Sequence, residues 1–311
     1  MYKRIIHQLW NRSLTTTTAA ALPHPPINYR VTQSPNKGNT LVATESIKQN
    51  GIVLTDVPIC IHNNQYDPYE LIHNRCNYCL YGTYKYNNNN GPVTVDGTYY
   101  CNQSCFDNNR LLHKLQHTGI DQSITYSKYE LMCESLCLQY INSVFKQSPN
   151  NVWQQLKSLC YVNISVDDNI QCKYNILCNK LSIQYHQSIT IIQQIVPISL
   201  YIHILGVLHI NTFALYNKSI NQSDALHIGS ALYNIASYIN HSCQPNIQLI
   251  YPIQQYSRIT AFTALTNIDI NEELCVTYCD ITMNVVERRG YLRHYYGFDC
   301  MCSKCMNELN M

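Results

Sequence analysis

The sequence predicts an α+β fold in which short strands near both ends of the chain enclose a helical middle. Turn-separated runs of β-branched and aromatic residues between residues 29 and 57 predict the first strands. Residues 121–200 instead place apolar side chains three and four positions apart, which is typical of packed helices. Strand-like runs return at residues 247–278, and a helix is predicted at residues 285–295.

Size and composition limit the possible classes of protein. A chain of 311 residues exceeds the usual size of a single domain, so we expect a main domain with insertions. A net charge of +2, with only 13% charged residues, argues against nucleic-acid binding as the main activity. Sixteen cysteines without an apolar signal peptide are expected to be zinc ligands and buried thiols in a reducing compartment, and we predict no structural disulfide.

Residues 1–28 are predicted to form a basic leader, which leaves the localisation open. Residues 1–44 contain five lysines and arginines but no acid, and an apolar helical face near the start is similar to that of a mitochondrial presequence. A run of threonines and alanines followed by three prolines favours a disordered leader instead. We therefore favour the nucleus or cytoplasm and keep the mitochondrion as the alternative.

Four cysteines in the first third of the chain have the spacing of zinc knuckles. Cys76 and Cys79 form one C-x-x-C pair, and Cys101 and Cys105 follow after a low-complexity loop at residues 84–91. Paired thiolates of this kind suit tetrahedral zinc, so we predict that the four cysteines close one site. The alternative is a set of paired core thiols without metal.

Other possible ligands are interpreted as structural. His113 and His117 lie one helical turn apart and could bind metal, but no spare cysteine pair completes a second site, so we expect an exposed helix face. Five cysteines in the helical middle lack tight spacing and are expected to be buried or free thiols. They are Cys133, Cys137, Cys160, Cys172 and Cys178.

The most apolar run, residues 195–210, is too short and too interrupted for a membrane span. Pro197 breaks it near its start, and two histidines lie within it. We predict a buried helix here and expect no membrane partner.

A polar heptad at residues 240–246 separates a helical-looking run at 232–239 from a predicted strand at 247–251. Loops of this kind often carry functional side chains. The heptad contains Cys243, which has no local partner, whereas the C-terminal C-x-C-x-x-C needs one more thiolate for tetrahedral zinc. We therefore predict a second zinc site formed by Cys243, Cys300, Cys302 and Cys305.

Three signatures near the C-terminal end resemble those of one enzyme family. NHSC at residues 240–243, ELCVTY at 273–278 and YGFDCMCSKC at 296–305 are similar, in order and spacing, to the signatures of SET-domain protein-lysine methyltransferases. The four-cysteine insert and the helical middle resemble those of the SMYD subfamily, whose members carry a MYND zinc finger. The likeness covers about residues 30–306.

The resemblance implies a SET β-clip fold with a pseudoknot, in which the heptad loop threads beneath the last strand beside the cofactor pocket and the lysine channel. The SET domain would span residues 29–280 and would be split by a MYND-like finger at 70–117 and a helical insert at 121–205. Residues 281–311 would form a post-SET zinc-binding segment. The two implied zinc sites are structural.

The resemblance also implies a cofactor and site residues. The chain would be an S-adenosylmethionine-dependent methyltransferase that acts on lysine in a protein substrate, with Tyr278 as its catalytic residue and Phe298 stacked on the adenine ring. The implied cofactor-binding residues are Gly38, Asn39, Asn211, Asn240, His241, Tyr278 and Phe298.

The tyrosines suit this chemistry. Methyl transfer from a sulfonium is an in-line displacement, which needs a neutral amine held at near-attack distance in a channel that keeps water out. Tyr278 can direct its phenol oxygen at the transferring methyl group. Tyr238, together with Tyr295 or Tyr296, is a candidate for the channel wall.

The sequence departs from the family pattern in two places. Thr40 replaces the second glycine of the cofactor turn, and the finger has half of the usual MYND ligand set, with His117 where a cysteine is normal. The alternative function is therefore a catalytically decayed SET and zinc-finger protein that acts as a protein-interaction module. Retention of Asn240, Tyr278 and Phe298 argues for the enzyme. The finger lacks an aromatic and basic stripe, so we expect no direct nucleic-acid binding.

Overall fold

The computed structural model describes most of the chain. The described residues are 28–35, 37–63, 75–80, 93–118, 124–148, 152–217, 226–250 and 258–310. The predicted leader, apart from its last residue, and the low-complexity loop at residues 84–91 lie outside these ranges, so both stay predictions.

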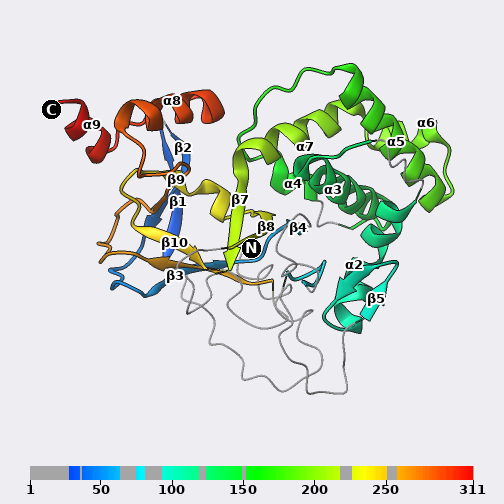
Figure 1. Ribbon diagram of the computed structural model, residues 1–311, viewed down its shortest axis with the longest axis horizontal. Coiled ribbons are helices and arrows are strands. Elements are labelled where there is room, and N and C mark those ends of the chain that lie inside the picture. The colour runs from blue at the N-terminus through cyan, green and yellow to red at the C-terminus, as the bar shows by residue number, and fades with distance from the viewer. Residues whose placement is uncertain are drawn as a thin grey trace.

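The molecule has a strand-rich part and a helical part (Figure 1). Most of the short sheets and the two C-terminal helices, α8 (Val285–Tyr296) and α9 (Ser303–Leu309), lie on one side, whereas β5 (Val93–Val95) lies on the other beside α2 (Gln103–His117). The predicted helical middle lies on the other and contains α3 (Lys128–Phe145), α4 (Val152–Leu156), α5 (Asp168–Tyr185), α6 (Ile189–Ile195) and α7 (Ile198–Asn211). The predicted α+β class is confirmed.

The residues of the expected cofactor turn lie in the first hairpin. β1 (Tyr29–Ser34) pairs antiparallel with β2 (Gly38–Ala43). Gly38 has a φ of +71°, a left-handed conformation that glycine adopts without the steric cost of a Cβ atom. Thr40 is buried, and its hydroxyl lies 2.6 Å from that of Thr32 across the hairpin. The hairpin therefore accommodates a threonine in place of the family glycine through a cross-strand hydrogen bond.

Two three-stranded antiparallel sheets surround the core of the strand-rich part, in the orders β10-β11-β3 and β4-β8-β7. Phe213, Tyr233 and Phe262 pack edge to face in this core, with ring centroids 5.6 to 6.2 Å apart. The strands are β3 (Ile52–Asp56), β4 (Cys60–Asn63), β7 (Thr212–Asn217), β8 (Leu226–Leu232), β10 (Ile247–Ile250) and β11 (Thr260–Ala264).

The run at residues 232–239 is not the helix that its sequence predicts. β8 continues into this run while it pairs with β4 and β7, and only a single 3-10 turn follows, η1 (Ala236–Tyr238). The Asp56 carboxylate accepts the backbone N–H groups of Ile235 and Ala236 at 3.1 and 3.0 Å and so caps the turn. The strand pairing of Leu232 and the capping by Asp56 of a distant strand therefore outweigh the local helical pattern.

The apolar run at residues 195–210 forms α7, as predicted, after a break at Pro197. Leu200, Ile204 and Leu208 of α7 are buried in the larger apolar core together with residues of α3. No single helix among the described residues has the length and apolar composition of a membrane span. Taken together, α6 and α7 reach the length and the apolar composition of a span, but the two helices are bent by 50° relative to each other.

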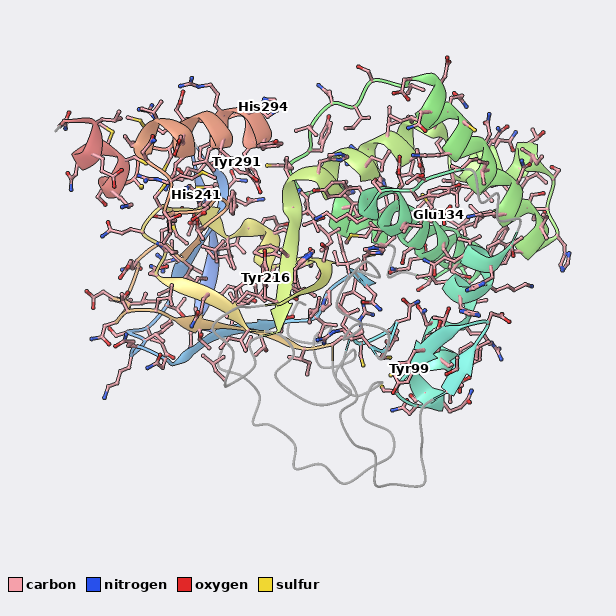
Figure 2. All side chains as sticks on the ribbon, viewed as in Figure 1. Tyr99, Glu134, Tyr216, His241, Tyr291 and His294 are labelled. Atoms are coloured by element: carbon pink, nitrogen blue, oxygen red, sulfur yellow. The ribbon has the colours of Figure 1, made fainter. Side chains whose placement is uncertain are left out.

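Two buried ion pairs cross the helical part between α3 and α5. Lys173 Nζ lies 2.7 Å from Glu130 Oε1, and Lys180 Nζ lies 3.0 Å from Glu134 Oε1. Glu134, labelled in Figure 2, is surrounded by side chains of the helical part. Both lysines also lie over the ring of Tyr126. Since these ions are removed from water, each depends on its partner.

We predict that Lys180→Met lowers the free energy of unfolding by about 3–5 kcal/mol, because it leaves the Glu134 carboxylate buried without its cation. The double variant Lys180→Met with Glu134→Leu should recover most of this loss. Denaturant unfolding measures both changes. Lys157→Met, at an exposed lysine of the same part, is the control and should leave stability nearly unchanged. Equal losses in the single and double variants would contradict the argument.

Candidate functional site

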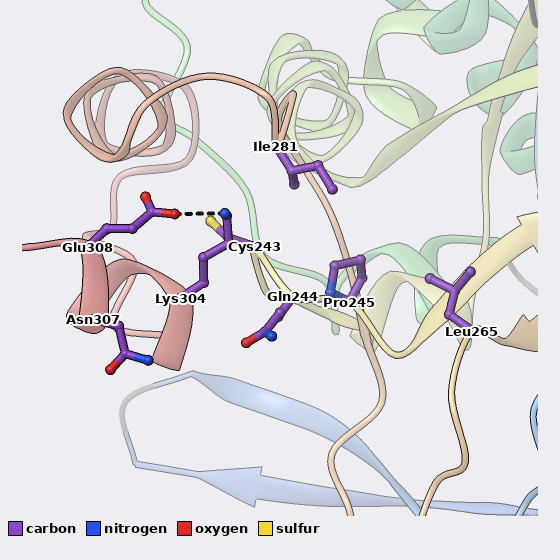
Figure 3. Close-up of a pocket in the computed structure, with 8 residues that line it drawn as sticks. All are labelled: Cys243, Gln244, Pro245, Leu265, Ile281, Lys304, Asn307 and Glu308. Atoms are coloured by element: carbon purple, nitrogen blue, oxygen red, sulfur yellow. Dashed lines mark ion pairs between the residues drawn. The ribbon is translucent and has the colours of Figure 1, made fainter.

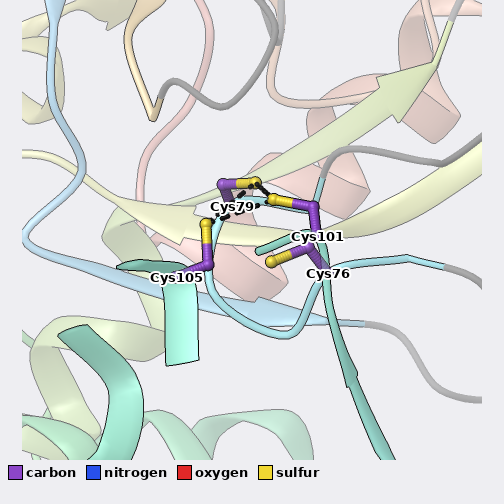
Figure 4. A group of neighbouring side chains, drawn as sticks. All are labelled: Cys76, Cys79, Cys101 and Cys105. Atoms are coloured by element: carbon purple, nitrogen blue, oxygen red, sulfur yellow. Dashed lines mark hydrogen bonds between the residues drawn. The ribbon is translucent and has the colours of Figure 1, made fainter. Parts of the chain in front are cut away.

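The four cysteines of the finger converge in space (Figure 4). Their Sγ atoms all lie within 4.8 Å of one another, and all four side chains are buried. Cys101 Sγ lies 3.6 Å from Cys79 Sγ and 3.2 Å from Cys105 Sγ. Cys76 completes the group. Four convergent thiols are the donor set of structural tetrahedral zinc sites.

A tight turn places the first pair of these thiols. After Cys79 the chain passes through Leu80, which has a φ of +55° and donates its backbone N–H to the Cys76 carbonyl at 2.9 Å. A left-handed residue other than glycine or asparagine is uncommon and marks a constrained backbone. The turn points both sulfur atoms in one direction.

A hairpin and a capped helix place the second pair. β5 (Val93–Val95) and β6 (Thr98–Tyr100) lead directly to Cys101. Asn102 then caps α2 (Gln103–His117), because its Oδ1 accepts the backbone N–H of the second cysteine of the pair at 2.8 Å. The second thiol therefore lies in the first turn of a helix and faces the first.

The sequence predicts an exposed helix face at His113 and His117, and this is wrong for His113. Only 5% of His113 is exposed; its Nδ1 lies 3.1 Å from Tyr100 Oη, and its Nε2 lies 3.3 Å from Asp96 Oδ2. His117 stays partly exposed, with Nε2 3.3 Å from Thr98 Oγ1. The packing of α2 against the hairpin buries His113, and neither ring belongs to the thiol group.

The C-terminal cysteines also converge on the heptad loop. Cys243 Sγ lies 3.9 Å from Cys300 Sγ and 3.5 Å from Cys305 Sγ, and with Cys302 all four Sγ atoms lie within 4.8 Å of one another. Here too the donor set fits tetrahedral zinc, although Cys243 precedes Cys300 by 57 residues in the sequence.

The ends of α8 and α9 bring three of these thiols to the loop. Asn284 and Glu287 form a capping box at the start of α8, and Gly297, with a φ of +75°, ends it. The chain then turns through Cys300 and enters α9, whose first turn carries Cys305. Local capping chemistry therefore specifies both ends of α8, whereas α9 begins at Cys302 without a side-chain cap.

Arg288 is a charged neighbour of this cluster that the sequence did not reveal. Only 1% of the residue is exposed, and its Nη2 lies 3.8 Å from Cys305 Sγ and 2.6 Å from Glu308 Oε2. A guanidinium beside four thiolates offsets the negative charge that one divalent ion leaves uncompensated. Its position inside α8 belongs to no motif, so no sequence signal pointed to it.

The heptad loop threads beside the segment that leads to Tyr278. β9 (Asn240–His241) pairs in parallel with β12 (Cys275–Val276), and Ser242 continues the pairing by donating its backbone N–H to the Val276 carbonyl at 2.9 Å. Two parts of the chain that are separated by a hairpin thus lie side by side. This crossing is the predicted pseudoknot.

His241 connects the Tyr278 segment to the thiol cluster. Its Nδ1 accepts the backbone N–H of Tyr278 at 2.9 Å, so Nδ1 carries no proton. The proton of the neutral ring then lies on Nε2, which is 3.3 Å from Cys243 Sγ and donates to it. The tautomer is assigned from these partners.

Two predicted cofactor-binding residues meet in one polar group. Asn240 Nδ2 lies 3.4 Å from the Asn39 carbonyl and 3.1 Å from Glu273 Oε1. Lys37 Nζ lies 2.5 Å from the other oxygen of Glu273. Lys37 and Glu273 were not predicted as site residues. Lys37 directly precedes Gly38, and Glu273 is the first residue of the ELCVTY signature, which are the only sequence signals for them.

Aromatic rings surround Tyr278. Its ring centroid lies 4.8 Å from that of Tyr296 and 5.4 Å from that of His241, and Phe298 lies 6.0 Å from His241. Tyr278 Oη donates to the Ile239 carbonyl at 2.5 Å. Burial raises the pKa of Tyr278 well above its usual range, so the phenol stays protonated.

The other candidates for a channel wall lie elsewhere. Tyr295 is 55% exposed and packs against Tyr291, which Figure 2 labels beside α8, at a centroid distance of 4.5 Å. Tyr238 Oη lies 2.8 Å from Ser158 Oγ in the helical part. Of the three tyrosines considered, only Tyr296 packs against Tyr278.

Asn211 is held by the helical part. Its Nδ2 donates to the Cys160 carbonyl at 2.8 Å and to the Val207 carbonyl at 2.7 Å, so both amide protons are used within the protein. Neither of these hydrogen bonds joins the Asn211 amide nitrogen to the polar group at Asn240.

A cavity of about 540 Å³ lies against the C-terminal thiol cluster (Figure 3). Its wall includes Cys243, Pro245 and Ile281, and Lys304 and Glu308 form an ion pair of 2.7 Å at its edge. Its lining contains none of the predicted cofactor-binding residues. The cavity is therefore separate from the Asn240 group.

Comparisons with known proteins agree with this geometry. The model of one protein family, the SET domain, matches residues 38–279. A SET and MYND domain-containing protein of Dictyostelium discoideum is 30% identical over 112 residues, which are 35% of this chain and 32% of the relative. The histone-lysine N-methyltransferase ASHR1 of Arabidopsis thaliana is 23% identical over 284 residues, or 89% of this chain and 55% of the relative. The chain thus spans about half the length of these relatives or less.

Among solved structures, the SET domain of LSMT bound to lysine and AdoHcy is similar with a TM-score of 0.43 and 11% sequence identity. The match covers 96% of this chain and 57% of that chain. The fold assignment rests on the family match and not on this likeness.

The two thiol groups generate a metal-content prediction. Reduced protein should contain two zinc ions per chain, one for each group of four cysteines, with Cys76→Ser and Cys302→Ser each losing one. Elemental analysis after removal of loose metal measures this. Cys172→Ser, at an exposed cysteine on α5, is the control and should keep both ions. A single zinc in the unsubstituted protein would mean that one thiol group does not bind metal.

Proposed function

Because the chain belongs to the SET domain family, we propose that it is an S-adenosylmethionine-dependent methyltransferase that transfers methyl groups to lysine side chains of proteins. The observation that carries the proposal is the parallel pairing of β9 (Asn240–His241) with β12 (Cys275–Val276), two residues before Tyr278. The names of relatives such as histone-lysine N-methyltransferase ASHR1 of Arabidopsis thaliana support the lysine substrate.

The residues beside the pseudoknot fit such a cofactor. An amino-acid end needs paired polar groups, and the amide of Asn240, the Asn39 carbonyl and the Glu273 carboxylate lie together. An adenine ring needs an aromatic face, and Phe298 lies next to His241. The cofactor, when bound, supplies a methyl group on a positively charged sulfur. Gly38 lets the hairpin backbone approach closely.

Tyr278 and its neighbours would hold the reacting amine. The protonated phenol is fixed by its bond to the Ile239 carbonyl, and the ring of Tyr296 lies beside it. Rigid aromatic walls exclude water, and a positioned hydroxyl oxygen can orient a neutral amine in line with the methyl group. The bond from the Tyr278 backbone to His241 fixes the direction in which the tyrosine leaves its strand.

Zinc in the C-terminal cluster would act structurally. Four thiolates fill a tetrahedral shell and leave no position for water or substrate. The cluster would join the heptad loop to the segment that carries Phe298, so metal binding and the shape of the cofactor site would be coupled. No proton or methyl group would pass through the metal.

We predict that Tyr278→Phe lowers the rate of methyl transfer by about 100-fold or more, because it removes the hydroxyl that would orient the amine. The affinity for S-adenosylmethionine should stay near that of the unsubstituted protein, since Tyr278 Oη bonds to Ile239 and not to the Asn240 group. A radiolabelled-methyl assay on cell lysate, with mass spectrometry of the labelled protein, measures transfer, and calorimetry measures binding.

Tyr295→Phe is the matched control for this experiment, because it removes a hydroxyl from an exposed tyrosine of α8. It should retain transfer. Absence of cofactor binding by the zinc-replete, unsubstituted protein would refute the enzyme and would favour a protein-interaction module built on the same fold.

A further inference from the structure

Cys279 is a fifth thiol beside the C-terminal cluster. Its Sγ lies within 4.8 Å of both Cys243 Sγ and a ring nitrogen of His241. The pairing of β9 with β12 explains this placement, since the parallel register that sets His241 opposite Val276 brings the residues after each strand together. Four other thiols complete a tetrahedral zinc shell, so Cys279 has no role as a ligand of that ion.

A second metal ion does not fit the group formed by His241, Cys243 and Cys279. A metal would need the lone pair of His241 Nε2, which requires the ring proton to move to Nδ1. Nδ1 faces the backbone N–H of Tyr278 at 2.9 Å and accepts from it, so it has no room for a proton. The group is therefore a pair of neighbouring sulfur atoms with a hydrogen-bond donor beside one of them.

We propose that Cys279 is an oxidation site, at which a peroxide joins it to Cys243 in a disulfide and so dismantles the C-terminal zinc site. The proposal rests on the proposed occupancy of that site by zinc. Because the disulfide can be reduced again, oxidising conditions would disrupt the cofactor site and reducing conditions would restore it.

The chemistry balances with peroxide as the only co-reactant. The Cys279 sulfur attacks one peroxide oxygen; the O–O bond breaks, and the departing hydroxide takes the thiol proton to form water, which leaves a sulfenic acid. The Cys243 sulfur then attacks the Cys279 sulfur; the S–S bond forms, the S–O bond breaks, and the second hydroxide takes a proton from solvent. The two sulfur atoms lose two electrons in total, and peroxide gains them.

The surroundings of the two thiols permit this reaction. Cys279 is 9% exposed, which makes it more accessible than Cys243 at 1%. A turn holds it, because Thr277 Oγ1 donates to the Cys279 carbonyl at 2.7 Å. The cavity of about 540 Å³ has Cys243 in its wall, and a molecule as small as peroxide fits there easily. Cys279 is not part of the cavity wall, but its Sγ lies within 4.8 Å of the Cys243 Sγ that is, so a small oxidant in the cavity comes close to both sulfur atoms.

Disulfide formation would act on the site from both strands of the pseudoknot. Cys243 follows His241 by two residues, and Cys279 directly follows Tyr278. A sulfur in a disulfide no longer serves as a thiolate ligand, so three thiolates would remain for zinc. Loss of the ion would release the segment that carries Phe298 from the heptad loop.

The test begins with reduced, zinc-loaded protein that is titrated with hydrogen peroxide. Zinc release is followed with a chromogenic chelator, and disulfides are mapped by mass spectrometry of tryptic peptides under non-reducing conditions. Peptide 219–258 contains Cys243, whereas peptide 259–288 contains both Cys275 and Cys279. The variant Cys275→Ser therefore removes the ambiguity and is also a matched control, since Cys275 is a buried thiol four residues earlier outside both clusters.

We expect a crosslink between peptides 219–258 and 259–288, loss of the C-terminal zinc in parallel with it, and recovery of both after addition of reductant and zinc. Cys275→Ser should behave in the same way. Cys279→Ser should bind both zinc ions when reduced, form no such crosslink, and release zinc at higher peroxide concentrations.

Three results would overturn or separate the proposals. Crosslinks only among Cys243, Cys300, Cys302 and Cys305 would refute the role of Cys279, as would equal peroxide sensitivity of the Cys279→Ser variant. Reduced protein that lacks the C-terminal zinc but still forms the Cys243–Cys279 crosslink would remove the metal from the proposed function and leave the disulfide assignment in place.

Discussion

The parallel pairing of β9 with β12 is the contact on which the rest of the site depends. Two hydrogen-bonded residue pairs hold the heptad loop against the segment that ends at Tyr278. Every functional contact then follows from that crossing: His241 reaches the Tyr278 backbone, and Asn240 reaches the first hairpin at Asn39. A ladder this short is not stable by itself, so it needs support from both ends.

The C-terminal thiol cluster provides one of those supports. It joins Cys243 of the heptad loop to the three cysteines that follow α8, so that Phe298 stays beside His241. Arg288 lies buried next to the same sulfur atoms and also pairs with Glu308, which neutralises charge where water is excluded. Folding of this segment and binding of metal are therefore expected to be one process.

The helical part provides the other support. Tyr238, which lies in η1 just before the heptad, is bonded to Ser158, and Asn211 at the end of α7 is bonded to the Cys160 carbonyl. The short segment between α4 and α5 therefore contacts both η1, which precedes the heptad, and the end of α7. Its position depends in turn on the core of α3, α5 and α7, where two buried ion pairs join α3 to α5.

The sequence by itself determined the α+β class, the SET family, both groups of four cysteines and the order of the site signatures, because each depends on residue type and local spacing. Thiol pairs, capping residues and glycine turns act over a few positions, so their spacing survives in the sequence. The tertiary structure alone decided what depends on distant neighbours. It buried His113 under a hairpin, replaced a helix at 232–239 with a strand end and a 3-10 turn, and placed Arg288 beside Cys305 and Cys279 beside Cys243. Such contacts join residues far apart in the chain, and no local pattern records them.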